Sequence, residues 1–125
     1  MIPEIIHFGG GDCVTGSCHL LRAKGLSILI DCGIAQGNDK VVPMDQWGIK
    51  PCDIDYLFIT HAHVDHIGQV PDLIDNGFDG EIICTTPTRE ILFPMLEDAM
   101  GFSRRSDKQI SEVQKRLARS CQRQL

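Results

Sequence analysis

The sequence lacks any apolar run approaching the ~20 residues of a membrane-spanning helix. Met1 to Glu4 offers neither the basic start nor the apolar stretch of a signal peptide. None of the six cysteines forms a C-x-x-C pair, and several lie within apolar runs, where a buried thiol is usually reduced. These absences predict a cytoplasmic protein with no membrane partner and no cysteine metal site.

Basic residues are scarce in the first part of the chain. Residues 1–102 hold five basic and fifteen acidic side chains, whereas residues 103–125 hold seven basic and two acidic ones. A basic segment on an acidic body indicates either a polyanion partner such as nucleic acid or simply a solvated helix face. The net charge of −5 argues against a free-standing, tight RNA binder.

At 125 residues the chain is long enough for one domain with one modest core. Apolar runs bounded by turn residues predict strands at about residues 2–8, 16–22, 26–31, 56–60 and 81–85. Helical spacing and start signals predict helices at about residues 68–75, 87–100 and 107–125. This order predicts an α/β (α+β) domain whose helices come mainly in the second half.

Three local patterns add detail to this outline. Ile91, Leu92 and Leu96 belong to a stripe at helical spacing, which is typical of core packing. Ser106 to Gln109 has the pattern of a capping box that opens the last helix. Trp47 lies in a long irregular loop, where it either anchors the loop or stacks a nucleic-acid base.

Metal-binding residue types are concentrated in His61-Ala62-His63-Val64-Asp65-His66, directly after the predicted strand 56–60. A period of two would place His61 and His63 on one side, with Asp65 and His66 at the following turn. Imidazole and carboxylate donors together suit borderline divalent metals, zinc first. The alternative is a polar strand end facing water, which does not account for three histidines and an aspartate in this order.

Other candidate residues are more isolated. Asp31 ends an apolar strand, where a carboxylate is costly to bury without a partner, although it could instead cap the following turn. His7 and His19 lie within predicted strands, and we interpret such single histidines as structural.

Thr60 to Gly68, read as T-H-A-H-V-D-H-I-G, resembles the H-x-H-x-D-H signature of the metallo-β-lactamase superfamily. Three further stretches resemble its RNA-processing β-CASP branch: Val14 to Cys18, Asp31 to Gly37, and Gly77 to Thr88. The resemblance covers roughly the first hundred residues. It implies the N-terminal half of an αββα sandwich, with the downstream half absent.

The resemblance also implies roles for individual residues. His61 and His63 would hold one zinc ion, and Asp65 and His66 the second ion of a complete two-zinc site. Asp65 would also orient the attacking water, and Asp31 would brace the site without ligating the metal. The family's remaining ligands are a histidine, a bridging aspartate and a final histidine, yet the last histidine of this chain is His66. We therefore expect a piece or relic of a longer protein, inactive or nearly so by itself.

Three functions are compatible with these patterns. The parent protein is expected to be a zinc-dependent ribonuclease that hydrolyses RNA phosphodiester bonds with metal-activated water. A second possibility keeps the fold but changes the substrate to a thioester, lactone or lactam. A third treats the chain as an inert fragment whose exposed apolar sheet face drives self-association into a homo-oligomer.

Overall fold

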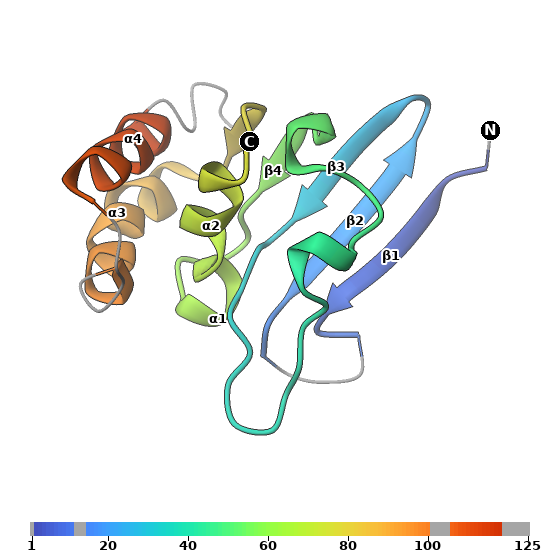
Figure 1. The fold of residues 1–125 in the computed structure, drawn as a ribbon, viewed down its shortest axis with the longest axis horizontal. Helices are drawn as coiled ribbons and strands as arrows, with labels where there is room; N and C mark the ends of the chain where they lie inside the picture. Colours follow the sequence, from blue (N-terminus) through green and yellow to red (C-terminus); the bar gives the residue numbers. More distant parts are fainter. Residues whose placement is uncertain (1, 12–14, 101–105, 119–125) are drawn as a thin grey trace.

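The computed structural model describes residues 2–11, 15–100 and 106–118. Within them the strands form one five-stranded sheet in the order β1-β2-β3-β4-β5 (Figure 1). The β1–β2 and β2–β3 pairs are antiparallel, and the β3–β4 and β4–β5 pairs are parallel. The strands are β1 (Glu4–Gly9), β2 (Cys18–Ala23), β3 (Leu26–Ile30), β4 (Tyr56–Phe58) and β5 (Glu81–Ile83). This mixed sheet with its helices confirms the predicted α/β class.

The described α-helices all come after β4 in the chain. They are α1 (Val64–Ile67), α2 (Val70–Asp75), α3 (Thr86–Met100) and α4 (Asp107–Ala118), with two 3-10 turns, η1 (Met44–Gln46) and η2 (Pro51–Asp53). The helix predicted at about 68–75 is confirmed by α2, which begins two residues later, but the short helix α1 before it was not predicted. Pro71 lies in the first turn of α2, where its missing N–H costs nothing, so a new helix starts there. The last seven residues of the predicted final helix lie outside the described residues.

One face of the sheet carries the core. Leu20, Leu29 and Leu57 are buried in adjacent positions across β2, β3 and β4. The helices cover them with a larger set of buried side chains, which includes Leu73, Leu92, Leu96 and Val113. Leu92 and Leu96 behave as the apolar stripe predicted, but Ile91 is 53% exposed, so that part of the prediction is wrong.

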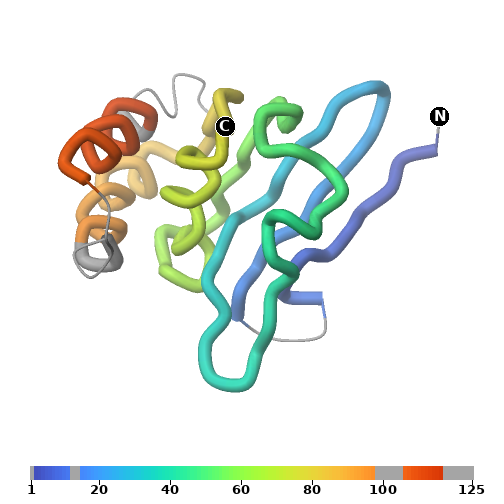
Figure 2. Tube along the Cα trace, viewed as in Figure 1, coloured from blue at the N-terminus to red at the C-terminus, as the bar shows by residue number. Residues whose placement is uncertain are grey.

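Residues 34–53 form a long excursion between β3 and β4 (Figure 2). Trp47 is buried and stacks on Phe8 of β1, with ring centroids 4.6 Å apart and planes 1° apart. Its Nε1 donates a hydrogen bond of 3.0 Å to the carbonyl of Val42. Trp47 is thus the loop anchor, and the alternative of an exposed base-stacking platform is wrong.

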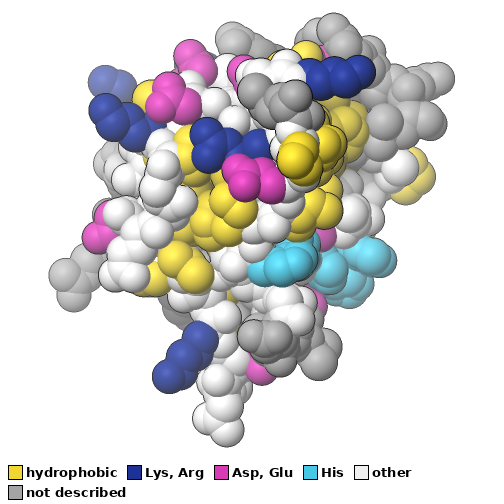
Figure 3. Space-filling view, turned by 90° about the vertical axis from the view of Figure 1, so that its right-hand side faces the viewer, with side chains coloured by type: hydrophobic (Ala, Val, Ile, Leu, Met, Phe, Trp, Pro, Cys, Tyr) yellow, Lys and Arg dark blue, Asp and Glu magenta, His cyan; other side chains and the backbone are white. Residues whose placement is uncertain are grey.

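The opposite face of the sheet is only partly covered by the described residues. Ile5, Leu21, Ile28 and Tyr56 form one row across four strands. Ile5 is 56% exposed, and the other three are half-buried. Figure 3 shows hydrophobic side chains gathered on this side of the molecule, next to histidines. An apolar sheet face of this kind is typical of a surface that packs against another part of a protein or another protein.

The last described helix is fixed at both ends. The backbone N–H of Gln109 donates to Ser106 Oγ at 3.2 Å, and the N–H of Ser106 donates to Gln109 Oε1 at 2.9 Å, which confirms the capping box. The Arg116 guanidinium donates to the carbonyls of Phe78 (2.9 Å) and Gly80 (2.7 Å). At least this one basic residue of the positive segment therefore holds α4 to the body.

Cysteine chemistry differs between positions. Cys18, Cys32 and Cys52 are free thiols, whereas Cys84 is disulfide-bonded, so the expectation of reduced thiols is wrong at Cys84. Burial raises the pKa of the Cys32 thiol, and a hydrogen bond with Cys18 adds to that increase. No helix among the described residues is long and apolar enough to cross a membrane.

Candidate metal centre

The candidate centre is built around Asp31, the residue that follows β3. Asp31 is almost fully buried, with 2% of the residue exposed, and its backbone adopts a left-handed φ of 62°. Its N–H donates to the carbonyl of Phe58 at 2.8 Å, which ties the end of β3 to the end of β4. The left-handed turn is tolerated by aspartate better than by most residues.

The Asp31 carboxylate accepts hydrogen bonds from three separate segments. Oδ1 accepts from the Thr60 N–H at 2.8 Å, and Oδ2 accepts from the Thr60 hydroxyl at 2.6 Å and from Ser17 Oγ at 3.3 Å. His66 Nδ1 lies 2.8 Å from the same Oδ2. An ionised carboxylate can only accept, so Nδ1 of His66 is the donor. A neutral His66 therefore keeps the lone pair of Nε2 available for a metal.

The backbone of the motif is fixed against the turn that follows Asp31. The Asp65 carbonyl accepts from the Ser17 N–H at 2.9 Å, and the His66 carbonyl accepts from the Cys32 N–H at 2.8 Å. A Cβ on Gly33 would lie only 1.8 Å from the Asp65 oxygen. Only glycine fits at this crossing, because the two backbones approach more closely than any side chain allows.

The predicted ligands gather at the end of β4 and in α1. The ring centroids of His61 and His66 are 4.7 Å apart, and Asp65 Oδ2 lies 3.6 Å from His66 Nε2. His61 Nδ1 lies 3.0 Å from the Thr60 hydroxyl. The Nε2 atom of the His61 ring therefore points away from Thr60. His63 is exposed at the N-terminus of α1 and makes no capping hydrogen bond with its side chain.

Zinc suits the chemistry of these donors but would find an incomplete shell. Within the described part of the chain, no group of three or more His, Cys, Asp or Glu side chains is placed to hold a metal ion. A working zinc site needs about three protein ligands. The metal-ligand roles of His61, His63, Asp65 and His66 thus remain predictions, and so does the supporting role of Asp31.

Two residues that matter to this geometry were missed by sequence reasoning. Thr60 uses both its N–H and its hydroxyl on Asp31, and Ser17 adds a third donor. Thr60 directly precedes the metal motif and Ser17 lies in the early stretch that resembles the β-CASP branch. Their places in the sequence, beside recognised motifs, could have drawn attention to both residues. Their hydrogen bonds to Asp31, however, depend on how β2, β3 and β4 are paired.

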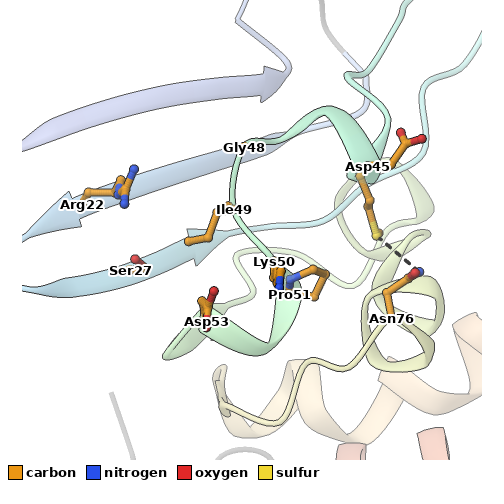
Figure 4. Close-up of a pocket in the computed structure, with 10 residues that line it drawn as sticks. Arg22, Ser27, Asp45, Gly48, Ile49, Lys50, Pro51, Asp53 and Asn76 are labelled. Carbon is orange, nitrogen blue, oxygen red and sulfur yellow. Dashed lines mark hydrogen bonds between the residues drawn. The ribbon is translucent and has the colours of Figure 1, made fainter.

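A separate hollow of about 600 Å³ lies at the other end of β3 (Figure 4). Residues of both charge signs line it: Arg22, Lys50, Asp45 and Asp53. The hydrogen bond of 3.9 Å between Asn76 Nδ2 and the sulfur of Met44 closes one side. This hollow contains none of the predicted ligands and is not part of the candidate centre.

Comparison with known proteins identifies the class. The metallo-β-lactamase superfamily matches residues 11–115, and the chain belongs to that superfamily. Human tRNase Z, short form, shares the fold with a TM-score of 0.52 at 24% identity, over 78% of this chain and 40% of that one.

Curated relatives define the branch. Ribonuclease TTHA0252 of Thermus thermophilus is 40% identical over 97 residues, which are 78% of this chain and 22% of that protein. Transcription termination factor FttA of Methanocaldococcus jannaschii is 34% identical over 114 residues, 90% of this chain and 18% of that protein. The predicted likeness to β-CASP proteins is confirmed by these relatives. The chain spans only about a fifth of their length.

Proposed function

We propose that this chain forms the N-terminal part of a zinc-dependent ribonuclease of the β-CASP type. The observation that carries the proposal is the contact between buried Asp31 and His66 Nδ1, next to the H-x-H-x-D-H turn. A carboxylate on the far nitrogen is the usual support of a metal-binding histidine. The similarity to a named ribonuclease favours RNA over a thioester, lactone or lactam as the substrate.

Each residue has a defined task in this proposal. His61 and His63 would bind one zinc ion, and Asp65 with His66 would bind the second. Zinc would lower the pKa of a bound water toward ~7 and polarise the phosphodiester under attack. Asp65 would orient that water, while Asp31 and Thr60 hold His66 in the required tautomer and ring orientation. The remaining ligands would come from residues beyond this chain, which by itself should be inactive or nearly so.

The test compares the 125-residue chain with the protein encoded by the whole reading frame. Labelled RNA should be cut by the longer protein with zinc, and cleavage should be lost in the His63→Ala and Asp65→Asn variants. Asp55→Asn is a matched control, because Asp55 is exposed and accepts one hydrogen bond from the Ser27 N–H at 2.9 Å. That variant should cut RNA normally.

Two outcomes would contradict the proposal. Intact RNA together with hydrolysis of a thioester, lactone or lactam would assign a different substrate to the same fold. Zinc-dependent cleavage by the 125-residue chain alone, abolished by His63→Ala, would show that its own four ligands suffice. At those four ligands the chain should instead bind zinc weakly or incompletely, as equilibrium dialysis would show.

A second candidate function is favoured by the half-covered sheet face. The chain alone would then be an inert fragment that self-associates through the row containing Ile5, Leu21 and Ile28. Sedimentation velocity should detect an oligomer that Ile5→Lys weakens. Ile91→Lys is the matched control, because Ile91 is similarly exposed but lies on α3. A monomer at all concentrations would rule this candidate out.

A further inference from the structure

Two histidines outside the metal motif touch each other across β1 and β2. His7 and His19 are paired residues of the two strands, and their Nδ1 atoms are 2.7 Å apart. Their rings meet edge to face, with centroids 4.9 Å apart and an interplanar angle of 87°. Two protonated Nδ1 atoms, or two bare lone pairs, would repel at this distance. One nitrogen must therefore donate to the other, or a cation must lie between them.

His19 already has the support that a metal-binding histidine needs. Its Nε2 lies 3.3 Å from Ser17 Oγ, which in turn lies 3.3 Å from Asp31 Oδ2. This leaves Nδ1 as the ligand atom, directed at His7. Burial and the neighbouring His7 lower the pKa of His19, although the charge of Asp31 opposes them. The ring is therefore neutral near pH 7, which is the form that binds metals.

The glycine run after β1 lies against both rings, of which His7 is exposed and His19 half-buried. A Cβ on Gly11 would lie 3.0 Å from the Cβ of His7, and one on Gly10 would lie 3.5 Å from Nε2 of His19. Longer side chains at these positions would cover the imidazoles. A hollow of about 620 Å³, lined by His7, Gly10 and Gly11 among others, opens beside His7. Figure 3 shows histidine side chains reaching the surface on this side.

We propose that His7 and His19 form a second cation site, which takes a borderline divalent ion such as Zn²⁺ through their two Nδ1 atoms. Water from the adjacent hollow completes the coordination. Two nitrogens on a tetrahedral zinc with bonds of ~2.05 Å lie about 3.3 Å apart. The two Nδ1 atoms, now 2.7 Å apart, need to separate by only about 0.6 Å. This site shares no ligand with the candidate centre and does not rest on the ribonuclease proposal.

The test uses the 125-residue chain with the first site removed. A His61→Ala, His63→Ala and Asp65→Asn background keeps the Asp31–His66 contact but loses the predicted ligands. Zn²⁺ titration, followed by dialysis and by ¹⁵N NMR of the imidazoles, should show one bound ion per chain and shifted Nδ1 signals of His7 and His19. His7→Gln in this background should abolish that ion, and Ser17→Ala should weaken it about tenfold.

Controls separate lost binding from lost folding. His7 is exposed, so His7→Gln should leave the circular dichroism spectrum and the urea midpoint unchanged. Glu4→Gln, an exposed change on the same strand, should bind zinc like the background. Three results would each refute the site: no bound zinc in the background, unshifted Nδ1 signals, or full zinc binding by His7→Gln. His7 and His19 would then be a pair joined only by a hydrogen bond between their Nδ1 atoms. The RNA assay of the longer protein reports on the first site separately.

Discussion

The Asp31→Asn variant should destabilise the chain and also disturb the candidate metal centre. Asparagine keeps Oδ1 as acceptor for the Thr60 N–H, but its NH₂ group replaces Oδ2. The hydroxyl of Thr60 and Nδ1 of His66 then face a donor instead of an acceptor. Hydrogen bonds to charged groups contribute about 1.5–3 kcal/mol each, and the Thr60 hydroxyl can rotate to accept. We therefore expect a loss of about 2–4 kcal/mol.

The same substitution should move a proton on His66. Nδ1 would have to accept from the new NH₂ group, so the ring would carry its proton on Nε2 and lose that atom as a ligand. ¹⁵N NMR of the imidazole distinguishes the two tautomers directly. Zinc affinity should fall about 10- to 100-fold, as is usual when the partner of a metal-binding histidine is lost.

Urea unfolding of the 125-residue chain measures how much Asp31→Asn lowers the free energy of unfolding. The left-handed backbone at Asp31 does not confound it, because asparagine adopts this conformation as readily as aspartate. Asp55→Asn serves as the control and should cost less than ~1 kcal/mol, since asparagine can still accept the Ser27 N–H. A loss at Asp31 no larger than at Asp55, with the His66 tautomer unchanged, would refute this account of the buried carboxylate.

Three more predictions concern other parts of the fold. Gly33→Ala should cost about 3 kcal/mol or more in urea unfolding, because its Cβ would overlap the Asp65 carbonyl; a neutral result would contradict the close crossing. Trp47→Ala should cost about 3–5 kcal/mol by removing the stack on Phe8, and an unchanged melting temperature would disprove its anchoring role. The lowered pKa of His19 means that the unfolded chain binds its proton first as the pH falls. The stability it contributes should thus be complete above about pH 6.5 and decline below it, and His19→Gln should flatten this slope.

The sequence was most informative about features that depend only on neighbouring residues. Apolar runs located the five strands of the described residues, because strand burial leaves a direct pattern in the sequence. Ser106 and Gln109 predicted a helix start, because a capping box involves only four neighbouring residues. Strand ends were less accurate. β4 ends at Phe58, before the predicted Thr60, since the Thr60 N–H bonds to a side chain instead of a neighbouring strand.

The site was predictable in its residue types but not in its connections. The spacing of His61, His63, Asp65 and His66 predicts metal donors, and the structure places His61 and Asp65 beside His66. Ser17 and Thr60 lie 14 and 29 positions from Asp31 in the sequence. Both donate to Asp31 only because strand pairing brings them into contact with it. The contact between His7 and His19 arises likewise, because β1 and β2 happen to pair in the register that places the two rings together.

If the proposed centre binds zinc, the hydrogen bonds around Asp31 also govern how the chain would acquire the metal. Their donors come from three stretches that meet only when β2, β3 and β4 have assembled, so a nascent or unfolded chain offers separate histidines instead of an organised centre. Zinc would then bind the native state far better than the unfolded one, and its concentration would shift the folding equilibrium. Metal supply would in that way act on the lifetime of the protein as well as on its chemistry.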